Sequence, residues 1–499
     1  MDLDSAACYR AVQARDARYD GRFFTCVKTT GIYCRPVCAA RPPKLENCRF
    51  VRTAAAAQAA GFRPCLRCRP ESSPDLDAWR GTEATVSRAL KLIEAGALDE
   101  GNVEVLASRL AIGARQLRRL FGCHLGATPI AVAQTRRVLL AKQLLHQTDL
   151  SMIDVALASG FGSVRRFNET FQRLYHRPPS AIRGRSTAAS PAPEISILLP
   201  YRPPYDWAAM IQFLAARAIA GVEVVTANSY SRVIEFDDVV GSIHVSHQPE
   251  QSSLHVTVRF PRLSLLPTII GRVRRQFDLG ADPIAIATAL SGDPLLAPLI
   301  LARPGLRVPG GWDGFETAVR AVLGQQITLK AATRLAGRVV GLLGKRVTEP
   351  LGLTGLTHVF PRPECFKSAG LLNLGIAKAR AATLAGIAEA VAEDPRLLEP
   401  HHDLAEAVAR LRAITGVGEW TAQYIAMRAL GESDAFLAGD VALQRKLAER
   451  GKHPSIRELL TRAERWRPWR AYALLYLWTA DADSAPVSMT KEAYNAISA

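Results

Sequence analysis

Residues 411–440 of the chain read LRAITGVGEWTAQYIAMRALGESDAFLAGD, and this stretch decides the fold of the C-terminal half. Its first part predicts two helices joined by a tight hairpin at GVG (416–418), because only glycine enters the region of positive φ without a penalty from Cβ. Such a hairpin leaves the first N–H groups of the second helix pointing outward, where they can bind a phosphate. Asp440 begins a new helical pattern over 441–449, so we expect its carboxylate at the same opening. The stretch therefore predicts DNA held by backbone amides beside one acid.

Four motifs in this order resemble the helix-hairpin-helix-Gly/Pro-Asp superfamily of DNA glycosylases, and most closely its AlkA-type 3-methyladenine glycosylases. They are VLGQQIT (322–328), LRAITGVGEWTAQYIAMRAL (411–430), FLAGD (436–440) and RWRPWRAYALLYLW (465–478). For the hairpin alone, a structural helix pair with Asp440 as a plain N-cap would be the better interpretation. Four ordered motifs favour the glycosylase.

The resemblance implies roles for individual residues. Asp440 would be catalytic, because base removal proceeds through a cation-like sugar that a carboxylate stabilises. The base is first flipped out of the stack, and a base made cationic by alkylation should bind aromatic faces. Family positions imply a base pocket of Trp420, Tyr424 and Trp478, and DNA contacts by Gly416, Gly418, Gln325 and Gln326. Gln326 or neighbouring Ile327 would fill the gap left by the base, whereas Trp466 and Trp469 are expected to pack structurally.

Two departures from the superfamily narrow the class of enzyme. Glu419 and Trp420 follow the hairpin where lyase-type relatives place a catalytic lysine, so we expect no strand cleavage through a Schiff base. No cysteine follows Cys365, so we expect no iron–sulfur cluster. The missing lysine indicates a monofunctional glycosylase.

Length and charge set the wider limits. At 499 residues the chain has room for roughly three to four domains of about 150 residues each. A net charge of +17 and a pI near 9.8 indicate a polyanionic partner. Residues 1–190 hold 29 Lys and Arg against 16 Asp and Glu, a net charge of +13, whereas residues 191–499 hold 34 against 30, a net charge of +4. The N-terminal part is thus predicted to be the stronger electrostatic binder of double-stranded DNA.

The N-terminus shows no targeting segment. MDLDSAACYR is acidic and has no apolar core, and no apolar run is long enough to span a bilayer. We therefore expect a soluble, cytoplasmic protein without a membrane partner.

Seven of the nine cysteines lie before residue 69. An odd count without a secretion signal argues against a disulfide framework. Three residues separate Cys34 from Cys38 and two separate Cys65 from Cys68, spacings at which four thiolates can converge on one tetrahedral Zn²⁺. On spacing alone, a purely structural zinc ribbon is the commoner outcome.

The sequence around these cysteines resembles the N-terminal domain of Ada, the methyl-phosphotriester repair protein and regulator, over nearly all of residues 1–75. The resemblance rests on FTCVKTTGIYCRPVCAARPP (24–43), CRF (48–50) and AAGFRPCLRC (59–68). It implies that Cys34, the first zinc thiolate, takes the methyl group once and irreversibly. A thiolate is the nucleophile, and zinc keeps it deprotonated. Methylation would change the charge of the four-thiolate site from −2 to −1, which should strengthen DNA binding. The other cysteines, Cys8, Cys26, Cys48, Cys123 and Cys365, lack ligand spacing.

Residues 83–185 predict helices that contain two matched helix-turn-helix units, 103–121 and 152–175. Their second helices are basic, with Arg115, Arg118 and Arg119 in the first and Arg165, Arg166 and Arg173 in the second. The region resembles the AraC-type DNA-binding domain, with its closing signature in DVALASGFGSVRRFNETFQRLYHRPPSAIR (154–183). The resemblance implies two helices in successive major grooves and, for an activator, RNA polymerase as a partner. The candidate groove residues are Arg115, Gln116, Arg165 and Arg166; the structural alternative is arginines on a solvated helix face.

These assignments give a multidomain α+β fold class. Residues 1–76 would form a small zinc-bound α/β domain and residues 83–185 an all-α double helix-turn-helix domain. After a polar linker at 184–193, β-branched runs and a helix near 207–219 predict a small antiparallel-sheet (TBP-like) domain over 194–282, to which we assign a scaffold role. Residues 283–484 would form the all-α glycosylase domain, with loops at 303–314 and 351–363.

The leading hypothesis is a fused alkylation-damage protein. Its front half would be an Ada-type methyl acceptor and transcription activator, and its back half an AlkA-type glycosylase that excises 3-methyladenine-type bases. One alternative is a regulator whose glycosylase half is a catalytically inactive DNA-binding arm. Another is a zinc-ribbon transcription factor without methyl transfer.

Overall fold

The computed structural model describes residues 3–73, 84–99, 101–183, 194–348, 351–399, 403–448 and 453–479. The expected linker at 184–193, the segment 77–82 between the first two expected domains and the expected end at residue 484 lie outside these residues. The chain divides into two compact units, one of residues 1–201 with 248–272 and one of residues 202–247 with 273–499. Among the helices described, none combines the length and the hydropathy needed to cross a bilayer.

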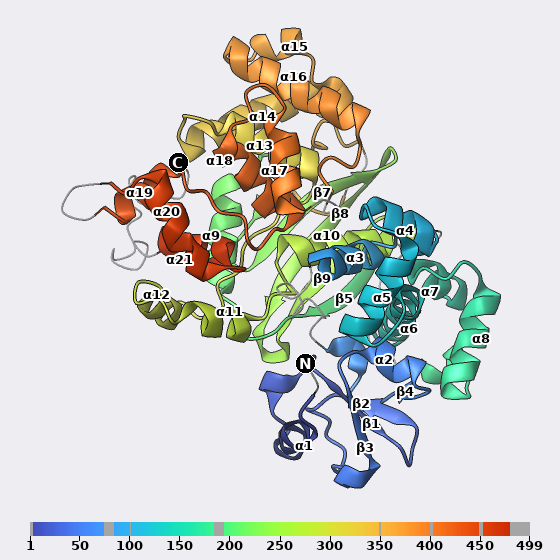
Figure 1. The fold of residues 1–499 in the computed structure, drawn as a ribbon. Coiled ribbons are helices and arrows are strands. Elements are labelled where there is room, and N and C mark those ends of the chain that lie inside the picture. The colour runs from blue at the N-terminus through green and yellow to red at the C-terminus, as the bar shows by residue number, and fades with distance from the viewer. Residues whose placement is uncertain are drawn as a thin grey trace. The chain divides into compact units, whose positions relative to one another are not determined.

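The first unit begins with a small sheet (Figure 1). β1 (Phe24–Val27) pairs antiparallel with β2 (Ile32–Cys34) and β3 (Cys48–Val51), and β4 (Arg63–Pro64) lies parallel to β2, which gives the order β3-β1-β2-β4. Short helices accompany it: α1 (Ser5–Ala14), η1 (Ala17–Tyr19), η2 (Leu45–Asn47), α2 (Ala54–Ala59) and η3 (Pro70–Ser72). Since β2 and β4 are parallel neighbours, their carboxyl ends deliver Cys34 and Cys65 to the same edge of the sheet, and the Cys65 N–H donates to the Tyr33 carbonyl at 3.0 Å.

The helical part of the first unit contains both predicted helix-turn-helix units. Its helices are α3 (Ala84–Glu94), α4 (Val103–Arg109), α5 (Ala114–Leu125), α6 (Pro129–Gln147), α7 (Met152–Ala158), α8 (Val164–Tyr175) and η5 (Pro179–Ile182). Thr128 caps α6 by accepting from the Ala131 N–H, and Pro129 stands at its first position, where its missing N–H costs nothing. The buried faces of α5 and α8 carry the aromatic and aliphatic residues, so the arginines of both helices point to solvent.

The zinc-type sheet and the helix-turn-helix region share packing through α2. Ala55 belongs to the same buried cluster as Leu117 and Phe121 of α5, and Leu139 of α6 packs against the core beneath the sheet. The Thr53 hydroxyl donates to the Leu125 carbonyl at 2.9 Å in buried surroundings. One short helix therefore serves two cores.

The predicted β-rich region is distributed over both units. In the first, β5 (Glu194–Pro200) pairs antiparallel with β9 (Ser253–Arg259), flanked by η6 (Pro249–Gln251), η7 (Leu263–Leu265) and the start of α10 (Leu266–Gln276). In the second, β6 (Glu223–Val225), β7 (Ser229–Phe236) and β8 (Val239–Gln248) form an antiparallel meander after α9 (Trp207–Arg217). The sequence did not predict β5, although its side chains alternate between buried and partly buried positions.

Helices dominate the rest of the second unit, as predicted. They are α11 (Pro283–Leu290), α12 (Ala297–Ala302), α13 (Gly314–Leu323), α14 (Leu329–Leu343), η8 (Pro363–Cys365), α15 (Ser368–Leu372), α16 (Lys378–Glu393), α17 (Leu404–Arg412), α18 (Glu419–Ile425), the π-helical turn η9 (Ala426–Leu430), α19 (Val441–Lys446), α20 (Ile456–Ala463), η10 (Glu464–Trp466) and α21 (Arg470–Thr479). One large apolar cluster joins these helices, and α21 is buried along nearly its whole length.

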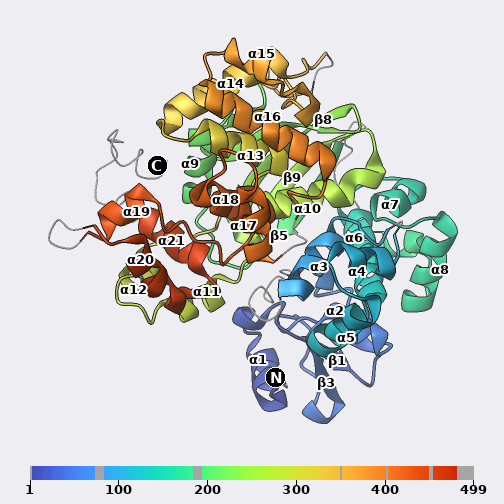
Figure 2. The same cartoon turned by 45° about the horizontal axis from the view of Figure 1, so that its top comes forward.

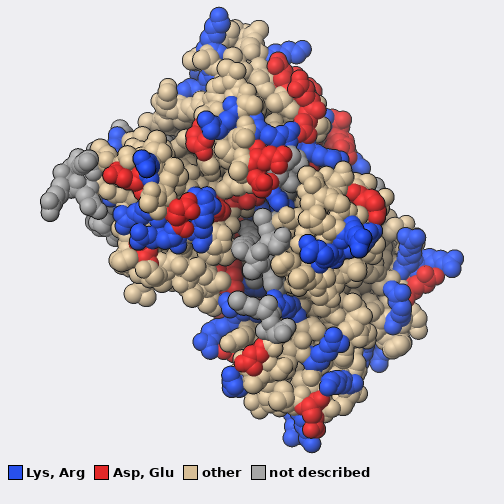
Figure 3. Space-filling model, in the orientation of Figure 1, with Lys and Arg blue, Asp and Glu red and all other residues tan. Residues whose placement is uncertain are grey.

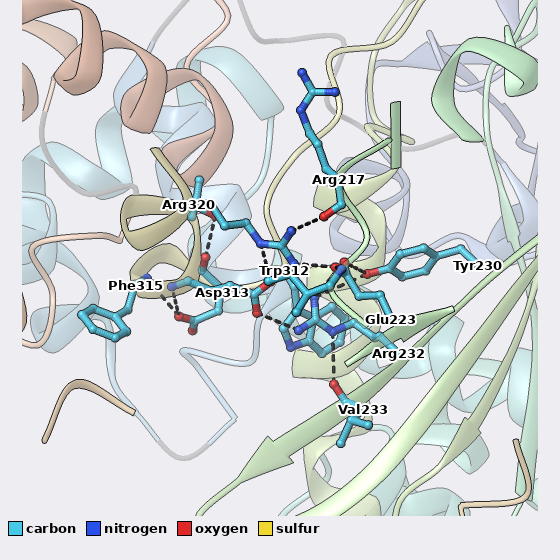
Figure 4. A network of polar contacts seen from close by, with 12 residues as sticks. Arg217, Glu223, Tyr230, Arg232, Val233, Trp312, Asp313, Phe315 and Arg320 are labelled. Carbon is cyan, nitrogen blue, oxygen red and sulfur yellow. Dashed lines mark hydrogen bonds and ion pairs between the residues drawn. The ribbon is translucent and has the colours of Figure 1, made fainter. Parts of the chain in front are cut away.

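A buried network of four charges fastens the meander to α13 (Figure 4). Glu316 accepts from Arg232 and from Arg320, each at 2.7 Å, and Arg320 also donates to Glu223 at 2.5 Å. Tyr230 donates to the second oxygen of Glu223 at 2.7 Å. Two cations thus balance two anions. Burial by itself would raise the pKa of Glu316, but the positive charges of Arg232 and Arg320 hold that pKa below the ordinary glutamate value.

Glu316→Gln should destabilise the second unit by about 3–5 kcal/mol at neutral pH, because it leaves two buried guanidiniums short of one anion. Six of the seven tryptophans lie in this unit, so the urea midpoint followed by tryptophan fluorescence reports on it. Glu364→Gln, at an exposed position, is the matched control. Because folding lowers the pKa of Glu316, the ionised carboxylate stabilises the folded state at pH values above the ordinary glutamate pKa, and this stabilisation is lost as pH falls through the pKa of the folded state. The urea midpoints of the wild type and of Glu316→Gln should therefore converge in acid. Equal midpoints for these two proteins at pH 7 would contradict the role of the network.

Candidate active site and DNA-binding surfaces

The predicted hairpin lies between α17 and α18, which lie side by side in Figures 1 and 2. Gly416 has φ +88°, and a Cβ there would lie 1.9 Å from the Thr383 hydroxyl oxygen, so both conformation and space require glycine. Gly418 caps α18 with φ −82°, so the expectation of positive φ was wrong for this residue. A Cβ on Gly418 would meet nothing within 4 Å, which leaves its backbone open to a close approach from solvent.

Asp440 is the N-cap of α19 and is also bonded to two tryptophans. Its Oδ1 accepts from the Leu443 N–H at 2.8 Å and from Trp478 Nε1 at 3.1 Å, and its Oδ2 accepts from Trp420 Nε1 at 3.1 Å. The residue is only 1% exposed. Burial raises the pKa of the Asp440 carboxyl above its ordinary value, and these donors offset only part of that effect. Among the described residues no cation pairs with this carboxylate. A positively charged group that entered the site would therefore be the first cation to pair with Asp440.

The predicted aromatic residues lie around two neighbouring cavities. The Trp420 and Tyr424 rings stack with centroids 5.2 Å apart and 12° between their planes, and both line the first cavity. Trp478 lines the second. Arg217 and Leu329 line both, and Asp440 accepts one indole N–H from each side. The structure thus brings the predicted pocket residues together with the predicted acid.

Sequence reasoning missed the contribution of α9 to these cavities. Phe213 and Arg217 of α9 line them, with the Arg217 guanidinium 3.7 Å from the centroid of the Phe213 ring. Residues 194–282, to which the sequence assigned a scaffold role, thus also contribute cavity-lining side chains through this helix. No local motif marks these two residues, because they reach the cavities from a helix about 200 positions earlier in the chain.

Arginines also make the first cavity electropositive. The Arg428 guanidinium lies 5.5 Å from the centroid of Tyr424 and 4.3 Å from that of Phe213. Although burial alone raises the pKa of Tyr424, Arg428 and Arg217 hold it below the ordinary tyrosine value. Burial lowers the pKa of Arg428 to about 10. The cavity is thus an aromatic wall backed by cations, and the sequence analysis had named only its aromatic residues.

The turn between α13 and α14 carries the candidate gap-filling residues. Gln326 is exposed, with φ +58°, whereas Ile327 is partly buried and lines the first cavity. Gln325 faces the hairpin: its Nε2 donates to the Gly416 carbonyl at 3.2 Å and to the Thr421 hydroxyl at 3.0 Å. Its own carbonyl accepts from Arg380 at 2.6 Å. The side chain of Gln325 therefore ties this turn to the hairpin.

The two other tryptophans of the last motif pack as predicted. Trp466 is 1% exposed and donates to Asp293 at 2.8 Å, and Trp469 is also buried.

The four predicted zinc ligands converge. The Sγ atoms of all four residues, Cys34, Cys38, Cys65 and Cys68, lie within 4.8 Å of one another. Tetrahedral Zn–S bonds of about 2.3 Å place sulfurs about 3.8 Å apart, so this donor set fits one Zn²⁺. Arg35 ion-pairs with Asp20 and donates to the Cys68 carbonyl at 3.2 Å, which holds the two ligand loops together.

The remaining cysteines vary in exposure, and none of them joins the quartet. Cys8 and Cys26 are buried, Cys48 is partly buried, and Cys123 and Cys365 are exposed.

The second helix of each helix-turn-helix unit presents basic residues to solvent. Figure 3 shows Lys and Arg side chains gathered over α5 and α8. The exposed candidates are Arg115, Gln116, Arg165 and Arg166. Arg165 pairs with Glu169 on its own helix at 2.8 Å, an exposed contact of the kind that contributes little to stability. All four predicted groove residues are thus accessible from solvent.

Comparison with known proteins recovers the same parts in the same order. Family models match residues 7–71 (metal binding domain of Ada), 106–185 (helix-turn-helix domain) and 196–313 (AlkA N-terminal domain). A relative from Mycobacterium tuberculosis (strain CDC 1551 / Oshkosh), a probable bifunctional transcriptional activator/DNA repair enzyme AlkA, is 40% identical over 484 residues, 96% of this chain and 97% of its own length. DNA-3-methyladenine glycosylase 2 of Escherichia coli (strain K12) is 34% identical over 284 residues, 56% of this chain and 95% of its own.

One solved structure supports the fold of the second half. The 3-methyladenine DNA-glycosylase from Archaeoglobus fulgidus matches with a TM-score of 0.51 at 23% identity, and covers 59% of this chain and 100% of its own.

Proposed function

The chain belongs to the family of bifunctional transcriptional activator/DNA repair enzymes of the AlkA type, and from that membership we propose that it excises alkylated bases with one half and reports DNA methylation with the other. The enzyme is a DNA-3-methyladenine glycosylase joined to an Ada-type methyl acceptor, and its partner is DNA. The observation that carries the proposal is the buried Asp440 carboxylate, held by two indoles at cavities beside an exposed hairpin.

We propose that Asp440 stabilises the sugar cation formed when the N-glycosyl bond breaks. The bonding electrons leave with the alkylated base, which departs neutral because alkylation had made it a cation. Water then bonds to the sugar carbon and loses a proton, and the anionic Asp440 favours both the cation and that proton loss. Trp420, Tyr424 and Trp478 would bind the flipped base, and the Gly416 and Gly418 backbone would bind the phosphate beside it.

We assign the gap-filling role to Gln326 rather than Ile327. Gln326 is exposed at the tip of its turn, whereas Ile327 already lines the cavity. Gln325 is then a positioning residue, because its amide is spent on Gly416 and Thr421. It sets the distance between the residue that enters the duplex and the hairpin that holds the backbone.

In the front half, the Cys34 thiolate attacks the methyl carbon of a phosphotriester. An S–C bond forms as the C–O bond breaks, and the phosphate oxygen keeps the electron pair, which restores the phosphodiester anion. Cys34, Cys38, Cys65 and Cys68 would hold Zn²⁺, which supplies the positive charge that keeps Cys34 a thiolate at neutral pH. The step occurs once per chain because a thioether has no easy return path.

The helix-turn-helix helices would then hold an operator. We propose that Arg115, Gln116, Arg165 and Arg166 contact this operator. Activation of transcription would require RNA polymerase as a second partner. We propose the cytoplasm as the location, since every proposed substrate is DNA.

Asp440→Asn should lower single-turnover release of 3-methyladenine from a methylated duplex by about 100-fold or more, because the anion is lost. The urea midpoint should stay equal or rise, since burial already disfavours the anion. Asp403→Asn, at the N-cap of α17, controls for capping. No release by the wild type would favour the inactive-arm alternative, and undiminished release by the variant would exclude Asp440.

The wild-type rate should fall as pH is lowered through the raised pKa of Asp440, above the ordinary aspartate range, because protonation removes the anion.

Gln325→Leu and Thr421→Val should each slow excision about tenfold by loosening the tie between the gap-filling turn and the hairpin. Because the two residues form one contact, the double variant should be no slower than the worse single variant. Gln326→Ala is the comparison: because Gln325 acts by positioning Gln326, the loss in the Gln325→Leu/Gln326→Ala double variant should be smaller than the sum of the two single losses. Additive losses for Gln325 and Thr421 would contradict the tie.

Exposure to a duplex with one methylphosphotriester should add one methyl group to Cys34, as read by mass spectrometry of the digested chain. Cys34→Ala should take none, whereas Cys123→Ala, at an exposed cysteine outside the quartet, should behave as the wild type. Full zinc content without methyl uptake by the wild type would favour the zinc-ribbon alternative.

A further inference from the structure

Lys142 of α6 is a fully buried cation that neither proposed reaction uses. Its side chain is 0% exposed, and its Nζ donates to the Glu71 carboxylate at 2.7 Å and to the carbonyl of Cys65 at 3.0 Å. Taking two charges out of water costs several kcal/mol per ion before their attraction repays it. An apolar side chain would fill the position more simply, so stability alone does not explain the ion pair.

The pair ties the methyl-acceptor quartet to the helix between the two DNA-reading units. Cys65 is one of the four thiolates, and α6 runs from the first helix-turn-helix unit to the second. A second tie runs through Gln58, which accepts from Thr135 of α6 at 3.2 Å and donates to the Tyr33 hydroxyl at 3.0 Å. Tyr33 directly precedes Cys34. The backbone at Cys65 and the residue before Cys34 are thus both tied to one helix.

This fastening matters because charge acts over a short range. Methylation of Cys34 removes one negative charge from the quartet, and at physiological ionic strength such a change is felt over about 8 Å. If the quartet moved freely relative to the DNA-binding helices, its distance from the duplex would vary and the change in charge would have little effect on DNA affinity. A quartet fixed to α6 keeps a constant distance from the bound duplex.

We propose that Lys142 is the positioning residue that couples the methylation state of the quartet to operator affinity. The proposal rests on the proposed function of the front half. It assigns to Lys142 no part in methyl transfer itself, because its Nζ is spent on Glu71 and on a backbone carbonyl.

The test compares operator affinity before and after methylation in the full chain. A duplex is selected from random-sequence DNA by the methylated wild-type chain, and Kd is measured with it at about 0.15 M salt. The variant is Lys142→Met/Glu71→Gln. Its matched control, Lys44→Met/Glu46→Gln, removes the same two charges from an exposed pair, 83% and 73% exposed, in the same part of the chain.

The variant should take up methyl on Cys34 as the wild type does, but its gain in affinity on methylation should fall at least fivefold. The control should keep the full gain. Gln58→Leu, which cuts the second tie without touching a buried charge, should also lower the gain. Undiminished gain in both Lys142→Met/Glu71→Gln and Gln58→Leu overturns the proposal, as does loss of methyl uptake with zinc retained. If the wild type takes up no methyl on Cys34, it is the proposed function of the front half that fails.

Discussion

The glycosylase half depends on one buried balance of charge, the contact of Arg232 and Arg320 with Glu316 and Glu223. Arg320 completes the set by donating to the Arg217 carbonyl at 2.6 Å, so the same network fixes the end of α9 that reaches the cavities. It also anchors α13, whose last residue precedes the turn of Gln325 and Gln326. Four side chains, of which only Arg320 is partly exposed, therefore position the meander, a cavity wall and the turn of Gln325 and Gln326.

Which features the sequence predicts depends on how many residues along the chain each sequence pattern spans. The zinc quartet, the helix-turn-helix units and Asp440 are predictable because spacing and capping operate over a few residues. Confirmed on the same grounds is the helical character of the C-terminal half. Arg217 and Phe213 were missed because they enter the site from a distant helix, and no spacing rule connects them to Trp420.

Gly418 and Gln325 show a second limit, which concerns the reason for a residue rather than its place. Glycine at 418 was explained by backbone conformation, yet its φ is ordinary and a Cβ there would meet nothing within 4 Å, so neither conformation nor space within the chain requires glycine. Gln325 was predicted from the motif as a DNA contact, and the structure shows in addition that its amide bonds to the hairpin. A sequence motif indicates which residue type occupies a position. Only the contacts in the three-dimensional structure indicate why that residue type is required there.

The sharing of α2 between two cores bears on how such a chain can arise by gene fusion. Separating the zinc-bearing sheet from the helix-turn-helix helices would expose Ala55 on one side and the surface beneath Leu139 on the other. Recombination between them would be selected against, and substitutions on either face of α2 would have to be matched on the other. The methyl acceptor and the helix-turn-helix helices should therefore be inherited as one block.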